Sequence, residues 1–244
     1  MSRKVAVITG ASRGIGRACA MELASHGYEV VINFVQNEAA AMETVEAIKA
    51  SGGSAYPFRA DVADAEEASA LIKFSLSLTG RIDVLVNNAA ISVVGLFTDI
   101  TADTEKRLFD VNLMGTLNCT KAVLPYMIRE QSGAIVNVSS MWGQVGASCE
   151  VHYSTAKAAI IGFTKALAKE VAPSGIRVNC VAPGVIDTEM NAHLSPDDLQ
   201  TLADEIPMGR LGSPAEVAEC VRFLCDSASY VTGQVISPTG GYIT

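Results

Sequence analysis

With 244 residues, the chain is long enough for one α/β domain or two small ones. Its composition, 49% hydrophobic and 18% charged, can build a sizeable core and excludes intrinsic disorder. A formal net charge of −8 argues against non-specific nucleic-acid binding, and no stretch approaches the ~18 consecutive apolar residues that span a membrane.

Short apolar runs alternate with longer segments of helical periodicity. Most of the short runs are continuously apolar, which is typical of strands covered on both faces in a parallel sheet. We predict strands at Val5–Thr9, Val30–Phe34, Ser54–Arg59, Val84–Asn87, Ala134–Val138, Arg177–Ala182 and Gln234–Ser237. We predict helices at Ile15–Ser25, Glu38–Ala50, Ala65–Leu78, Ala102–Arg129, Ser154–Val171 and Pro214–Cys225, the last with Ser213 as its N-cap.

The repeated alternation predicts right-handed βαβ units and an α/β, doubly wound parallel sheet. No linker, repeat or low-complexity segment divides residues 1–244, so we expect a single domain. The segment 187–212 is the exception, because it is polar, holds two prolines and interrupts the alternation. We predict that it forms a substrate lid.

Neither the cysteines nor the histidines indicate a disulfide framework or a metal site. The six cysteines are scattered without a C-x-x-C pair, which favours reduced, mostly buried thiols in a cytoplasmic protein. The three histidines, His26, His152 and His193, lack metal-ligand spacing, so we expect no structural metal.

The first predicted strand runs directly into a glycine-rich turn, and a helix follows. Glycine lets the backbone turn sharply and approach a ligand, and a helix N-terminus offers N–H groups and a partial positive charge to a pyrophosphate. The place of the turn predicts a dinucleotide site, and a purely structural tight turn is the alternative. The candidate cofactor residues are Gly10, Ser12, Arg13, Gly14, Ile15 and Gly16.

The end of the second strand helps to choose the cofactor. An NAD site usually carries Asp or Glu there for the ribose 2′-hydroxyl, but this chain has no acid between Asn33 and Asn37. Arg13, within the glycine turn, can pair with a 2′-phosphate, although it can also be a solvated surface charge. The sequence therefore favours NADP(H) over NAD(H).

Tyr153 and Lys157 lie four residues apart on one face of a predicted helix. A tyrosine is usually core and a lysine usually surface, but hydride transfer from a nicotinamide to a ketone also needs a proton donor. Tyr153 is a neutral acid at pH 7, and a cation at Lys157 is expected to lower the pKa of its hydroxyl. We therefore predict that the pair is the proton donor and its partner. We also count both residues among those that bind the cofactor, with Lys157 holding the nicotinamide ribose.

Two further polar residues are candidates for the same site. Ser140 follows the strand Ala134–Val138, where such folds place ligands, and its hydroxyl can bind the substrate oxygen; the sequence does not say whether Ser139 or Ser140 faces the site. Asn112, in the long fourth helical region, can hold a water that relays protons to Lys157, or can simply kink or cap a helix.

Together these residues resemble the short-chain dehydrogenase/reductase family. The matching motifs cover the chain nearly end to end: TGASRGIG (9–16), DV (61–62), NNAA (87–90), Asn112, Ser140, YSTAK (153–157) and PGVIDT (183–188). The resemblance implies a Rossmann-type sheet of about seven strands, a Ser–Tyr–Lys triad completed by Asn112, and assembly as a homotetramer. It also places Asp61 and Val62 near the adenine, Asn88 near its ribose, and Ile186 and Thr188 near the nicotinamide.

Within the family, the chain most resembles reductases of 3-oxoacyl groups on acyl carrier protein. Several residues depart from their pattern. The loop before Tyr153 reads SCEVH, the carrier-docking arginines fall on Gln131 and Ser174, and the usual NNAG is NNAA. Arg129, Lys121 and Lys165 are the cations that could supply a basic patch for an acidic carrier.

The run WGQVGASCEV (142–151) also resembles reductases of the 5-aminopentanone group on a modified lysine of elongation factor P. Glu150 in this run can attract an amine-bearing substrate, or can be a solvated loop acid. A third reading is a non-enzymatic NADP(H)-binding protein, since a fold does not fix a function.

Overall fold

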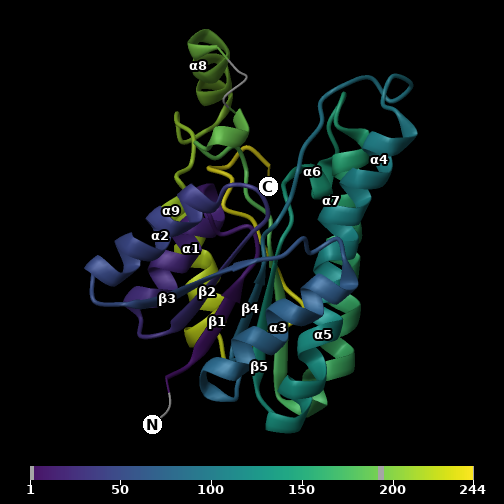
Figure 1. The fold of residues 1–244 in the computed structure, drawn as a ribbon. Coiled ribbons are helices and arrows are strands. Elements are labelled where there is room, and N and C mark those ends of the chain that lie inside the picture. The colour runs from purple at the N-terminus through teal and green to yellow at the C-terminus, as the bar shows by residue number, and fades with distance from the viewer. Residues whose placement is uncertain (1–2, 192–194, 244) are drawn as a thin grey trace.

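The computed structural model describes residues 3–191 and 195–243. Within these residues, seven strands form one parallel sheet in the order β3-β2-β1-β4-β5-β6-β7 (Figure 1). The strands are β1 (Val5–Ile8), β2 (Glu29–Phe34), β3 (Ser54–Arg59), β4 (Val84–Asn87), β5 (Gly133–Val138), β6 (Ile176–Val181) and β7 (Val235–Ile236). The predicted Rossmann-type doubly wound sheet is confirmed.

Helices connect the strands and agree with most of the predicted segments. They are α1 (Gly14–Ser25), α2 (Glu38–Ala50), α3 (Ala65–Thr79), α4 (Ala102–Phe109), α5 (Gly115–Glu130), α6 (Trp142–Val145), α7 (Val151–Val171), α8 (Pro196–Glu205) and α9 (Pro214–Arg222). The predicted cap of α9 is present as a capping box, in which Ser213 and Glu216 satisfy each other's backbone N–H groups.

The prediction of one helix over Ala102–Arg129 is wrong. The segment is interrupted by a π-helical turn, η1 (Asp110–Met114), between α4 and α5. A π-turn adds a residue to the helical repeat without changing the apolar pattern much, so periodicity alone does not reveal it. A second π-turn, η4 (Phe223–Ser227), ends the last predicted helix early.

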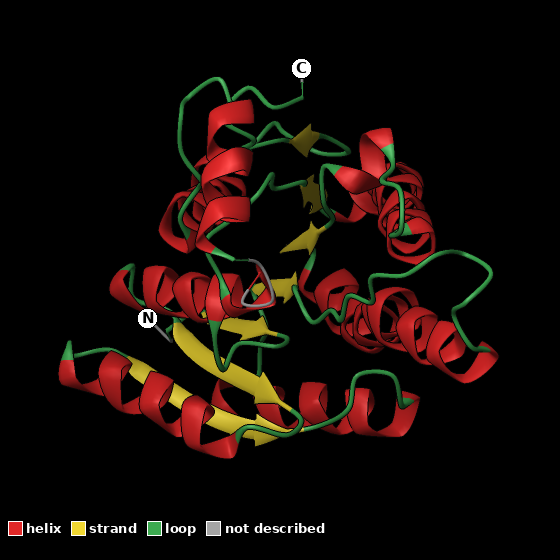
Figure 2. Ribbon diagram, turned by 90° about the horizontal axis from the view of Figure 1, so that it is seen from above, coloured by secondary structure: helices red, strands yellow, loops and turns green. Residues whose placement is uncertain are grey.

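Each face of the sheet is covered by its own helices and its own apolar core. Helices α1, α2 and α9 pack on one face through buried residues such as Leu23, Val45 and Val217. Helices α3, α5 and α7 pack on the other face through residues such as Leu71 and Val123, as Figures 1 and 2 show. Strands buried on both sides explain why their sequences are continuously apolar.

The strand order reverses between β1 and β4, which lie side by side and lead to helices on opposite faces. Such a switch point opens a crevice at the carboxyl ends of the strands, where α/β proteins bind ligands. The glycine turn follows β1 and Asn88 follows β4, so the topology brings both to this place.

The segment 187–212 leaves the body of the protein as a separate arm. It contains a short 3₁₀ turn, η3 (Glu189–Asn191), and α8, which stands above the carboxyl ends of the strands in Figure 1. A bridge between Ile186 and Gly212 closes the base of the arm. Residues 192–194 of the predicted lid lie outside the described residues.

None of the helices in the described part of the chain is long and apolar enough to cross a membrane. Across the same residues, no three His, Cys, Asp or Glu side chains form a group that could hold a metal ion.

Candidate active site

The glycine turn is shaped by two residues with left-handed backbone, Gly10 (φ 62°) and Gly14 (φ 54°). A Cβ on Gly10 would lie 2.9 Å from the Ala89 Cα, and one on Gly16 would lie 2.5 Å from the Asn88 amide nitrogen. Glycine is therefore required at Gly10 by conformation and space, and at Gly16 by space. This close approach leaves the backbone of Gly10–Gly16 open toward a ligand.

Polar side chains from β2 and α2 hold the turn in place. Asn33 accepts a hydrogen bond from the Gly10 N–H (3.2 Å) and donates one to the Ala60 carbonyl (2.9 Å), and Thr44 donates to the Ser12 carbonyl (3.2 Å). From the sequence, Asn33 was notable only because it is not acidic, and its support of the turn was not predicted. A buried Asn at the end of an apolar strand was the available signal for this supporting role.

Asn88 supports the turn as well. Its amide donates to the carbonyls of Thr9 (2.9 Å) and Gly10 (3.0 Å), and its backbone N–H donates to the Thr9 hydroxyl (2.9 Å). The predicted contact between Asn88 and the adenosine ribose therefore stays a prediction, and the structure gives the side chain a definite scaffolding role.

Asp61 and Val62 lie at the start of the segment between β3 and α3. The Asp61 carboxylate pairs with Arg107 (2.8 Å) and accepts from the Ala63 N–H (3.1 Å), while Val62 is buried against Gly115. These contacts fix the segment, and its proposed role near an adenine stays a prediction.

The N-terminus of α1 differs from those of α2, α3 and α4. Among the described residues no side chain caps α1, and its first turn carries no acid, whereas α2, α3 and α4 are capped by Asn37, Asp64 and Thr101. Uncapped N–H groups and the positive end of the helix dipole favour an anion. Together with the glycine turn that a Cβ would fill, these features fit a dinucleotide.

Ser140, Tyr153 and Lys157 meet beside the carboxyl end of β5. All three are buried, with 8%, 8% and 2% of their surfaces exposed. The Ser140 and Tyr153 side chains are hydrogen-bonded, and the Lys157 ammonium donates to the Val138 carbonyl (2.9 Å) and lies 5.5 Å from the centre of the Tyr153 ring. The spacing of four residues along α7 thus places the tyrosine and lysine together as predicted.

The structure also separates the two adjacent serines. Ser139 is buried and donates to the Lys157 carbonyl (2.7 Å), which fastens β5 to α7. Ser140 accepts from the Trp142 N–H (3.2 Å) and contacts Tyr153. Ser140 is therefore the serine at the site, and Ser139 positions the helix that carries Lys157.

The electrostatics differ from the expectation in one respect. The pKa of Tyr153 is raised to about 12, mainly by burial and also by the negative charge of Glu150, while the Ser140 hydrogen bond acts in the opposite direction. Burial lowers the pKa of Lys157 to about 8. The expected lowering of the Tyr153 pKa is not seen: burial is the largest influence on this hydroxyl and raises its pKa.

Asn112 lies in η1 and is fully buried. Its amide is paired with the backbone of Ile91, accepting from the N–H and donating to the carbonyl, both at 2.8 Å. The π-turn aims this side chain at the segment that follows Asn88. The structure thus shows Asn112 fixing the loop that borders the site, and its proposed water relay to Lys157 stays a prediction.

Glu150 borders the site, and a hydrogen bond from Ser92 holds its carboxylate. It occupies the N-cap position of α7, but its carboxylate accepts from the Ser92 hydroxyl (2.9 Å) and does not cap the helix. The preceding Cys149 adopts left-handed backbone (φ 63°), and its carbonyl accepts from the Gly95 N–H (2.8 Å). This geometry, one helical turn before Tyr153, disfavours the reading of Glu150 as a freely solvated acid.

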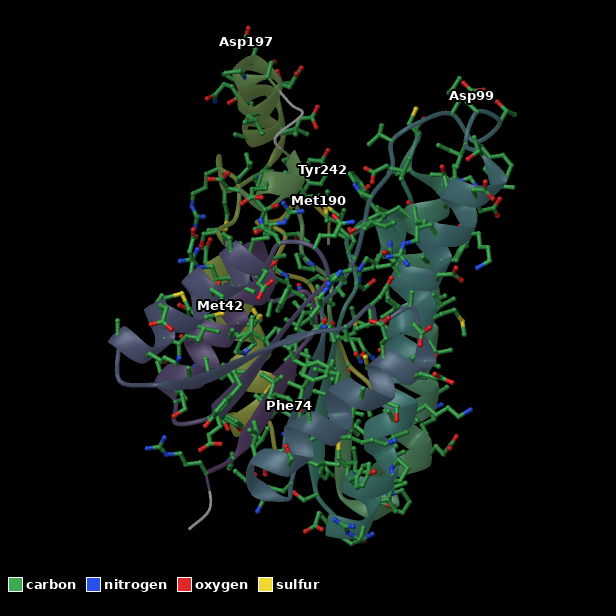
Figure 3. The ribbon with its side chains drawn as sticks, viewed as in Figure 1. Met42, Phe74, Asp99, Met190, Asp197 and Tyr242 are labelled. Atoms are coloured by element: carbon green, nitrogen blue, oxygen red, sulfur yellow. The ribbon has the colours of Figure 1, made fainter. Side chains whose placement is uncertain are left out.

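The residues proposed for the nicotinamide lie at the base of the arm. Ile186 is buried, and the Thr188 side chain faces Gly14, where a Cβ would be 3.6 Å from its Cγ2. Tyr242 also secures the arm by donating to Glu205 (2.8 Å) and meeting the Trp142 ring edge-on. Figure 3 shows Met190 and Tyr242 at the foot of α8.

Comparison with known proteins agrees with this fold. A family model described as short chain dehydrogenase matches residues 4–199. The chain belongs to the short-chain dehydrogenase family. It is therefore an oxidoreductase of the CH–OH/C=O couple that uses an NAD(P) cofactor.

Individual relatives cover almost the whole chain. A 3-oxoacyl-[acyl-carrier-protein] reductase from Synechocystis sp. is 44% identical over 245 residues, covering 100% of this chain and 98% of the relative. The uncharacterized oxidoreductase YmfI of Bacillus subtilis is 44% identical over 241 residues, with 98% of each covered. The reductase FabG of Staphylococcus aureus, named for the same carrier-bound substrate, is 43% identical over 239 residues, covering 98% and 97%.

Proposed function

We propose that the protein is an NADPH-dependent carbonyl reductase in which Tyr153 protonates the oxygen of a ketone. The observation that carries the proposal is the buried Tyr153 hydroxyl, hydrogen-bonded to Ser140 and beside Lys157, at the crevice that the glycine turn also borders. The reduced nicotinamide supplies a hydride to the carbonyl carbon.

The side chains of this protein manage the proton. With a pKa of about 12, Tyr153 holds its proton at neutral pH and can give it to the oxygen that gains charge as hydride arrives. Ser140 donates to the same oxygen or to the phenolate that forms. Lys157, with a pKa of about 8, is mainly cationic at pH 7 and stabilises that phenolate. Asn112 and Ser139 keep the surrounding backbone in place.

The low pKa of Lys157 predicts how reduction depends on pH. We expect kcat/KM to be level below about pH 8 and to fall above it, by about tenfold per pH unit, because the cation beside Tyr153 is lost. Initial rates of NADPH oxidation with a saturable ketone, measured across this range, test the prediction.

Stability should change in the opposite direction over the same range. The pKa of Lys157 is about 8 in the folded protein and 10.5 by reference when unfolded, so the unfolded chain binds more protons between these values. The contribution of Lys157 to the free energy of unfolding therefore rises as pH increases through this window. A Lys157→Met variant should lose this rise. For the reduction itself, a wild-type kcat/KM that stays level up to pH 10 would contradict the assignment of Lys157 as the cation that supports Tyr153.

For the substrate, we propose a 3-oxoacyl thioester carried on acyl carrier protein and reduced to the 3-hydroxyacyl product. The names of two relatives, each about 43–44% identical, support this choice. The cations predicted to bind an acidic carrier protein support this substrate less. Arg129 lies in the last turn of α5, which leads to the start of β5 and so to the opposite edge of the sheet, and it pairs there with Glu130 (3.1 Å).

A second candidate substrate is a ketone close to an amine, such as the 5-aminopentanone group on a lysine of elongation factor P. Glu150 favours it, because this carboxylate lies one helical turn from Tyr153 and is held toward the site by Ser92. A cation that paired with Glu150 would also cancel the charge that raises the pKa of Tyr153.

Replacement of Glu150 separates these two substrates. In Glu150→Gln we expect kcat/KM to fall about two- to tenfold for an amino-ketone and not to fall for an uncharged ketone of the same length. The matched control is Asp99→Asn, which removes the same charge at the tip of the loop before α4 (Figure 3). Equal effects of Glu150→Gln on both ketones would remove the support for an amine-bearing substrate.

The test of the proposed function is a panel of ketones assayed with NADPH and NADH side by side. We expect turnover of a 3-oxoacyl thioester with a preference for NADPH. For the second candidate, elongation factor P should gain two hydrogens in its intact mass. Binding of NADPH without turnover of any ketone would instead favour a non-enzymatic nucleotide-binding protein.

We also propose that the protein is a cytoplasmic homotetramer. Light scattering of the purified protein tests its oligomeric state.

A further inference from the structure

Arg13 of the glycine turn forms an ion pair with Glu189 of the arm. The Arg13 Nη1 and the Glu189 Oε2 lie 2.6 Å apart, although the two residues are 176 positions apart in the sequence. Arg13 stands immediately before α1, and Glu189 begins η3. The pair therefore joins the proposed cofactor turn directly to the proposed substrate lid.

The arginine that makes this pair is also a candidate to bind an added phosphate. Arg13 precedes the uncapped N-terminus of α1. The end of β2 carries no acid that would accept a hydrogen bond from a ribose 2′-hydroxyl, as an NAD site usually does. The Arg13 side chain is 61% exposed, so it can change partner without disrupting the core. This step rests on the proposed NADP(H)-dependent function.

Glu189 is held mainly by Arg13. Its own side chain is 65% exposed, and it borders an open hollow of about 540 Å³ between the start of α1 and the start of α9. Neighbouring contacts of the same segment do not involve Glu189: the Asp187 N–H donates to the Gly212 carbonyl (2.8 Å), and the Asn191 side-chain amide donates to the Ile186 carbonyl (2.8 Å). Loss of the Arg13 contact would leave Glu189 free to swing into solvent.

A 2′-phosphate and the Glu189 carboxylate compete for the same guanidinium. An exposed ion pair contributes little, so a phosphate that bears more charge and can bind the guanidinium at two points should displace the carboxylate. A ligand with only a 2′-hydroxyl cannot replace it in this way. The competition would weaken the binding of the phosphorylated ligand by about two- to fivefold.

We propose that Glu189 is a specificity-determining residue for the cofactor: its carboxylate occupies Arg13 until a 2′-phosphate displaces it, and this exchange frees residues 187–191 from the glycine turn. NADP(H) and NAD(H) would thus differ in affinity and also in whether they release the base of the arm.

Binding measurements without turnover test the first half of the proposal. By calorimetry, Glu189→Gln should bind NADP⁺ and adenosine 2′,5′-bisphosphate about two- to fivefold more tightly than the wild type, with no change for NAD⁺. Asp187→Asn is the matched control, because it removes an equal charge from the same segment and leaves the ion pair intact. In an Arg13→Met background, Glu189→Gln should have no effect on either ligand.

Hydrogen exchange tests the second half of the proposal, the release of residues 187–191 from the glycine turn. Adenosine 2′,5′-bisphosphate lacks a nicotinamide, so it reports the exchange at Arg13 alone. It should speed amide exchange in residues 187–191 of the wild type and leave Glu189→Gln unchanged, because that variant starts with the segment released. Adenosine 5′-monophosphate should leave both proteins unchanged.

The binding results separate a failure of the Glu189 role from a failure of the proposed function. Equal bisphosphate affinity in the wild type and Glu189→Gln, or the same gain in Asp187→Asn, would overturn the role of Glu189 and leave the proposed reductase intact. Binding of neither dinucleotide to the wild type would overturn the proposed function and this proposal together.

Discussion

Tyr153→Phe should lower the rate of ketone-dependent NADPH oxidation by about 100- to 10,000-fold. The substitution removes one oxygen from a buried ring and leaves its packing against Leu108 and Ala156 in place. The loss is therefore a loss of the proton donor and not of the fold. Steady-state kinetics on the purified variant measure the effect.

The affinity for NADPH and the melting temperature serve as controls for this variant. Both should stay close to those of the wild type, because the glycine turn and the two apolar cores are untouched. A rate within a few-fold of the wild type would show that another group supplies the proton.

Gly16→Ala should abolish NADPH binding. The added methyl group would meet the Gly10 carbonyl oxygen and lie 2.5 Å from the Asn88 amide nitrogen, so the turn and the residue that braces it cannot both keep their positions. Cofactor fluorescence or calorimetry measures the loss of affinity, and circular dichroism shows whether the fold is retained.

The matched control for this variant is Gly162→Ala in α7. Apart from the adjoining residues and backbone of α7 itself, no atom in the described residues lies within 4 Å of a Cβ at Gly162, and alanine is the better helix former by about 1 kcal/mol. This variant should bind NADPH normally and be slightly more stable. Normal NADPH binding by Gly16→Ala would refute the assignment of the glycine turn as the cofactor site.

Local sequence signals predicted the positions of most strands and helices well. The bounds of β3, β4 and α2 agree with those predicted, because turn residues and caps such as Asn37 flank apolar runs of clear period. The interruption of the helix after Phe109 was missed, because one extra residue in a π-turn leaves the apolar face nearly unchanged. Topology followed from the alternation of strands and helices.

The candidate site was predictable where sequence spacing determines geometry. Four residues on one helix placed Lys157 beside Tyr153, and a strand end placed Ser140 near both. The direction of the Tyr153 pKa shift was not predictable, since it depends on how deeply the ring is buried and on Glu150. The pair of Arg13 with Glu189 joins residues far apart in the chain, and no local pattern indicates it.

The most direct test of the central claim is the fate of the hydride. NADPH carrying deuterium at the transferring C4 position should yield a hydroxyl product with deuterium on the former carbonyl carbon, and Tyr153→Phe should yield almost none. Binding of this cofactor without transfer of deuterium to any ketone in the panel would contradict the proposed reduction.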